Sequence, residues 1–161
     1  MTRFRLIASV LLLVAVAMPS LSAAQEEEDS RSALGSWMLT ITPPPGGPPA
    51  FKVLASFADG GVFIATTQND HTMGAGIQQG TWHKTGDHLL SSTQLNFLYD
   101  SVGHPVGTLK IRATYSLTAT GDLTGEGQLL RCDLTGANCV SLPGCSAIEG
   151  KRIHVEAPQC Q

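Results

Sequence analysis

The chain has 161 residues, with ten lysines and arginines against 13 aspartates and glutamates and a formal net charge of −3. A chain of this length is expected to form one domain with a hydrophobic core of its own. Its weakly acidic balance lacks the clustered basic face that nucleic-acid binding requires, so we expect no nucleic-acid partner.

The first 24 residues have the pattern of a secretory signal peptide. Arg3 and Arg5 give a basic start, residues 6–18 are apolar apart from Ser9, and residues 22–24 are small. The apolar run is shorter than the roughly 20 residues of a transmembrane helix, so a retained anchor is the less favoured alternative. Cleavage after Ala24 leaves eight basic and 13 acidic residues, a net charge of −5. We expect a secreted or periplasmic protein without membrane contact.

Residues 25–34 follow the cleavage site and begin with an acidic run at positions 26–29. A charge run without apolar partners is typical of a solvated segment, so we interpret 25–34 as an acidic, mobile N-terminal tail. One folded domain is then expected to occupy residues 35–161.

Beyond the tail, apolar residues recur with a period of two, as in strands that are buried on one face. The clearest case runs from Leu109 to Leu117, where apolar and polar residues alternate strictly. Less regular alternation predicts further strands near residues 37–41, 51–57, 62–66, 80–84, 95–99, 123–129 and 151–155. No convincing long helix is found.

Short and long connections alternate between these strands. Residues 58–61, 85–87 and 120–122 contain the Gly and Asp of tight hairpin turns. Longer connections are expected at 42–50, 68–76, 100–105 and 132–150. This pattern predicts an all-β fold, an antiparallel up-and-down β-barrel of about eight strands, with the long loops together at one end. A β-sandwich is the alternative.

All four cysteines, Cys132, Cys139, Cys145 and Cys160, lie in the last thirty residues. An even number of cysteines in an exported chain predicts two disulfides and therefore a disulfide-bearing C-terminal loop. Three pairings are possible, and the sequence does not choose among them. A zinc site is the less favoured alternative because no Cys-x-x-Cys pair is present.

Gly35-Ser36-Trp37, at the start of the first strand, resembles the Gly-x-Trp motif of the lipocalins and the wider calycin group. The resemblance covers the barrel plan and two positions. It implies that Trp37 closes one end of the barrel and that Arg152, near the last strand, packs across its ring in a cation–π contact.

The same calycin-like resemblance implies a small apolar ligand inside the barrel. The candidate cavity residues are apolar or aromatic side chains expected to face inward: Trp37, Phe57, Ile64, Trp82, Phe97 and Tyr115. The competing interpretation is a barrel whose interior is completely filled by side chains.

No catalytic, cofactor or metal-binding motif is found, so we predict no cofactor and no metal site. His71 and His104, with Asp70 and Asp100 nearby, fall in two long loops, but nothing in the sequence fixes their separation. Two functions remain: a barrel that binds a small apolar ligand at its long-loop end, or a filled barrel that presents its cysteine-rich loop to a protein partner. An enzyme ranks third.

Overall fold

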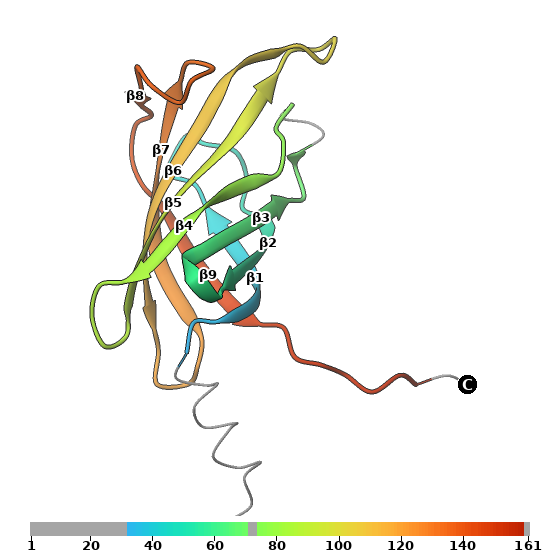
Figure 1. The fold of residues 1–161 in the computed structure, drawn as a ribbon, viewed down its shortest axis with the longest axis vertical. Helices are drawn as coiled ribbons and strands as arrows, with labels where there is room; N and C mark the ends of the chain where they lie inside the picture. Colours follow the sequence, from blue (N-terminus) through green and yellow to red (C-terminus); the bar gives the residue numbers. More distant parts are fainter. Residues whose placement is uncertain (1–31, 71–73, 160–161) are drawn as a thin grey trace, which may run out of the picture.

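The computed structural model describes residues 32–70 and 74–159, which form a closed antiparallel barrel (Figure 1). The elements are β1 (Gly35–Thr42), β2 (Phe51–Ala58), the 3-10 turn η1 (Asp59–Gly61), β3 (Val62–Thr67), β4 (Gln78–Lys84), β5 (Leu89–Tyr99), β6 (Pro105–Leu117), β7 (Leu123–Cys132), β8 (Val140–Ser141) and β9 (Ser146–Arg152). Strands β1 to β7 pair in chain order, and β9 closes the ring between β7 and β1. The predicted barrel is confirmed, and the sandwich alternative is wrong.

The two ends of the barrel differ in their connections. The β2–β3, β4–β5 and β6–β7 turns lie at one end, where the chain also enters β1 and leaves β9 (Figure 1). The long connections lie at the other end, as the alternation of short and long loops predicts. We call these the closed end and the open end.

The wall of the barrel is uneven in height. Strands β5, β6 and β7 have 11, 13 and 10 residues, whereas β1 to β4 have eight or fewer. The long strands therefore rise above the rest of the wall at the open end (Figure 1). There β8 pairs with β7 at Leu130 and Arg131, beyond the stretch of β7 that pairs with β9.

The inward face of β6 is the one that its alternation predicts, with Leu109, Ala113 and Tyr115 buried. On β3 and β5 the predicted inward face is wrong, because the inward positions are displaced by one residue from those expected. Phe63 is buried while Ile64 is 47% exposed, and Asn96 is buried while Phe97 is 50% exposed. A shift of one residue moves a whole strand's side chains to the opposite face.

The neighbouring strands explain both corrections. Ile64 pairs with Ser56 of β2, whose neighbours Ala55 and Phe57 face inward. Phe97 pairs with Thr108 of β6, whose neighbour Leu109 faces inward, so Ile64 and Phe97 both lie on the outer face. Both faces of β3 carry apolar residues, which leaves the alternation in its own sequence ambiguous. On β5 the apolar residues Leu95, Phe97 and Tyr99 suggest the wrong face, because the inward row of this strand is largely polar.

The structure near both ends of the described chain also differs from what the sequence predicts. Ala33 is 1% exposed and Leu34 packs against the core, so the residues from Ser32 onward belong to the closed end and not to a mobile tail. The last strand begins earlier than predicted, at Ser146, and ends at Arg152. The predicted signal peptide (1–24) and residues 25–31 of the predicted tail lie outside the described residues.

Candidate functional site

A cavity occupies the upper interior of the barrel. The centre of a water molecule can lie in about 80 Å³ of it, whereas one water needs about 10–15 Å³, so the cavity has room for several water molecules. Asp70 and Ala75 belong to its lining, which shows that it reaches the open end. Most of the lining is apolar and includes Leu39, Val53, Phe63, Leu109, Ile111 and Leu129.

One strand gives this cavity a polar side. Ser92, Gln94 and Asn96 are alternate residues of β5, and all three are at most 5% exposed. Gln94 and Asn96 line the cavity directly, and Gln78 of β4 joins them. The pairing of Gln79 with Leu95 places Gln78 beside Asn96 on the neighbouring strand.

The lower part of this polar row is linked to Tyr115. Gln94 Nε2 donates to Ser92 Oγ (2.6 Å) and to the Tyr115 hydroxyl (3.2 Å), and Ser92 Oγ donates to the same hydroxyl (3.3 Å). The Tyr115 oxygen accepts in both of its bonds, so its own O–H is available to donate. Burial raises the pKa of Tyr115, although the bonds from Ser92 and Gln94 lower it in part. The hydroxyl therefore stays protonated at neutral pH.

Asn96 is the unusual member of the row. Its side-chain nitrogen and oxygen are both buried, and neither has a hydrogen-bond partner in the part of the chain that the structure describes. A buried amide without partners is costly, because its donors and its acceptor have left water without compensation. Buried polar groups are nearly always hydrogen-bonded, so this one requires an explanation.

The mouth of the cavity carries a single described carboxylate. Asp70 Oδ1 accepts from the Thr67 hydroxyl (2.6 Å) and Oδ2 accepts from the Thr67 backbone N–H (2.9 Å), which holds the start of the β3–β4 connection. The described lining contains no lysine, arginine or histidine. The site is therefore suited to neutral molecules more than to anions.

The six predicted cavity residues separate into three groups. Tyr115 lines the cavity. Trp37, Phe57 and Trp82 are buried, but they pack in the core below it. Ile64 and Phe97 lie on the outer surface, so their prediction as lining residues is wrong.

Trp37 and Arg152 meet at the closed end. Trp37 is completely buried, its Nε1 donates to the Ala33 carbonyl (3.0 Å), and the Arg152 guanidinium lies 4.4 Å from the centre of its ring. Arg152 also donates to the Leu34 carbonyl (2.5 Å) and to the Ser32 carbonyl. The two residues pair directly across β1 and β9, so the sheet itself sets their contact.

A disulfide joins Cys132 to Cys139. Between them Asp133 accepts hydrogen bonds from Thr135, Ala137 and Asn138, and these bonds lower its pKa to about 2. The loop lies against the outside of β6, where Lys110 Nζ donates to the Gly136 carbonyl (2.7 Å). The disulfide therefore pins a loop onto the barrel wall.

The remaining two cysteines, Cys145 and Cys160, form no second disulfide within the described residues. Cys145 is exposed and forms no disulfide with another described cysteine. Cys160 lies outside the described residues. A second disulfide, between these two, stays a prediction.

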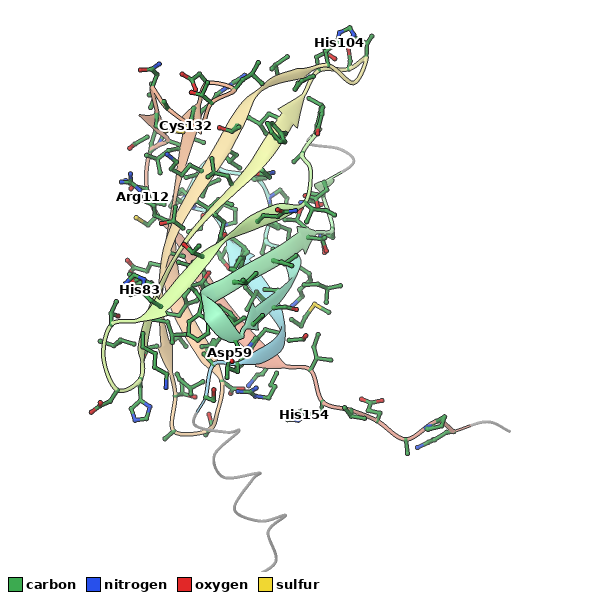
Figure 2. All side chains as sticks on the ribbon, viewed as in Figure 1. Asp59, His83, His104, Arg112, Cys132 and His154 are labelled. Carbon is green, nitrogen blue, oxygen red and sulfur yellow. A yellow bond between two sulfur atoms is a disulfide. The ribbon has the colours of Figure 1, made fainter. Side chains whose placement is uncertain are left out.

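The histidines that the structure describes do not converge on a site. His104 lies at the tip of the β5–β6 connection, whereas His83 lies toward the closed end and His154 in the C-terminal segment (Figure 2). His104 Nδ1 is 3.5 Å from Asp100 in an exposed pair, and His71 lies outside the described residues. Among residues 32–70 and 74–159, no group of three or more His, Cys, Asp or Glu side chains is placed to hold a metal.

Comparison with known proteins gives no match: no protein-family model, curated protein or solved structure matches this chain significantly. The eight-stranded antiparallel barrel is consistent with a calycin-like fold in general. Within the described part of the chain, no helix has the length and apolar character needed to cross a membrane.

Proposed function

We propose that this protein is an exported barrel that binds a small, largely apolar molecule inside its open end. The cavity carries this proposal. It combines an apolar lining with a few buried polar groups, which is the usual composition of a small-molecule site. Below it, the packed aromatic core closes the barrel, so a ligand would enter and leave at the long loops.

Two further observations support the lipocalin-like and exported character of the protein. The cation–π contact of Arg152 with Trp37 matches what the Gly-x-Trp resemblance implies for the closed end of such a barrel. The disulfide between Cys132 and Cys139 suits an oxidising compartment, in agreement with the signal-peptide pattern of residues 1–24.

A protein partner is the second candidate, and one surface favours it. Ile77, Phe97 and Leu134 are each about half exposed and surround a shallow depression on the outside of β4 to β6, beside the disulfide-bearing loop. This alternative is accompanied by a filled core, and the cavity at the open end favours ligand binding over it. We therefore rank ligand binding first.

Native mass spectrometry of the mature, oxidised protein, purified from cells that export it, tests ligand binding. We expect a small molecule to co-purify and to be lost from the variant Ile111→Trp, because Ile111 lines the cavity and tryptophan would fill it. The matched control is Thr114→Trp, which adds the same side chain to the same strand on its exposed outer face.

The control should retain the bound mass, and both variants should keep the circular dichroism of the barrel. If the protein exported under these conditions is free of any ligand, and remains so after incubation with an extract of apolar metabolites, the proposal is wrong. Equal retention by Ile111→Trp and Thr114→Trp would place the ligand outside the barrel and favour the outer surface.

A further inference from the structure

The unpartnered amide of Asn96 defines the chemistry of the ligand more closely than the apolar lining does. We propose that the ligand is a neutral molecule with a carboxamide-like head group, in which an N–H donor and a C=O acceptor lie side by side and pair with Asn96. This inference rests on the proposed function, because it assumes that the cavity is a binding site.

The argument begins with what Asn96 can bind. Its side-chain amide offers two N–H donors on nitrogen and an acceptor on oxygen. Asn96 is 4% exposed and belongs to the cavity lining, and its amide nitrogen and oxygen are both covered and without a partner in the described chain. A ligand therefore reaches them only when this side chain turns toward the cavity. A pure hydrocarbon would leave both atoms unpaired, and a ketone or ester would satisfy only the nitrogen. A carboxamide supplies both partners at once.

The surroundings then exclude a charged head group. A carboxylate would need a cation or several N–H donors to offset the loss of its hydration. The described lining has no basic side chain, and the carboxylate of Asp70 lies on the same cavity. An ammonium group is disfavoured too, because it has donors but no acceptor and would leave the Asn96 nitrogen unpaired.

The neighbours of Asn96 fit the same head group. Tyr115 keeps its proton and can donate it toward the ligand carbonyl, while Gln78 lies beside Asn96 on the adjacent strand. Beside this polar row, on the adjoining strands β6 and β7, Leu109, Ile111 and Leu129 would contact the apolar remainder of the molecule. The head group is thus placed on β5 and the body against β6 and β7.

Isothermal titration calorimetry of the mature, oxidised protein with four probes of similar shape tests the inference: benzamide, acetophenone, toluene and benzoate. We expect benzamide to bind about tenfold or more tightly than acetophenone or toluene, because only benzamide satisfies both amide atoms. Benzoate should bind weakest. This series uses the unaltered protein, so its outcome does not depend on whether a variant folds.

The variant Asn96→Leu adds a second measurement. Leucine has nearly the shape of asparagine but no polar atoms, so we expect the preference to reverse, with toluene binding more tightly than benzamide. The variant Thr114→Trp, altered on the outer face, should keep the preference of the unaltered protein.

The possible failures are distinguishable. If none of the four probes binds, the proposed function and the inference both fail. If toluene binds as tightly as benzamide, the cavity is a binding site but water satisfies Asn96, and only the inference fails. Tighter binding of benzoate would also overturn the inference, because the head group would then be anionic.

Discussion

The same eight strands build two very different interiors. At the closed end, Phe57 makes edge-on contacts with Phe63, Trp82 and Tyr115 at centroid distances of 4.9, 5.6 and 5.3 Å. At the open end, the walls enclose a cavity, and the inward residues of β5 change from Leu90 to the polar row that ends at Asn96. Within one strand of this barrel, the inward residues therefore change from packing in the core to lining a cavity.

The largest expected effect compares two phenylalanines of β2. Phe57 is 1% exposed in the aromatic core, whereas Phe51 is half-buried and lines the cavity. Phe57→Ala should lower the free energy of unfolding by about 3–5 kcal/mol. Phe51→Ala should lower it by only about 1–2 kcal/mol, because that side chain buries less area. Urea unfolding measures both values, and equal losses would mean that the open end is as tightly packed as the closed end.

The next effect concerns the residues that close the barrel. Arg152→Ala removes the cation–π contact with Trp37 and the bonds to the Ser32 and Leu34 carbonyls, and we expect a loss of about 2–3 kcal/mol. Lys151→Ala, one residue earlier, breaks an exposed pair with Asp122 and should cost much less. Thermal unfolding followed by circular dichroism compares the two, and the opposite order would show that Arg152 is not what closes this end.

The disulfide should contribute to stability without affecting the cavity. Its two cysteines are seven residues apart, and the chain-entropy relation gives a loss of roughly 2 kcal/mol for the double variant Cys132→Ala/Cys139→Ala. Benzamide affinity should be unchanged, because neither cysteine lines the cavity. A large loss of affinity, measured by calorimetry on the folded variant, would show that the loop controls access to the interior.

The smallest effect is a pH dependence within the same loop. Hydrogen bonds from Thr135, Ala137 and Asn138 lower the pKa of Asp133 from 3.8 to about 2. A carboxylate with a lowered pKa stabilises the folded protein above about pH 4 and loses this effect as the pH falls toward 2. Asp133→Asn should therefore lower the urea midpoint at pH 6 and make less difference near pH 2. A difference that is independent of pH would exclude the ionised carboxylate as its cause.

Local alternation and turn chemistry were sufficient to predict the barrel, the order of long and short connections, and the inward face of β6. The Trp37–Arg152 contact followed from the Gly-x-Trp resemblance. These features depend on local rules or on the ends of the first and last strands, which closure of the barrel brings together.

The polar residues that line the cavity could not be predicted in this way, because the alternation rule assumes that inward residues are apolar. On β5 the inward residues are Ser92, Gln94 and Asn96, and the apolar Leu95 and Phe97 lie outside. Only the pairing of β5 with β6 fixes this orientation. A useful signal in the sequence is a row of polar residues at alternate positions of one strand, next to a strand whose inward residues are strongly apolar. Such a row can line a cavity.

The most direct test of a hollow, ligand-binding open end is a methyl NMR titration of the mature, oxidised protein with benzamide. We predict chemical-shift changes at Leu109, Ile111 and Leu129, which line the cavity, and little change at Leu90, Leu117 and Leu123, which belong to the packed core. Changes confined to surface residues such as Leu54 and Ile64, or no changes at millimolar benzamide, would contradict the account.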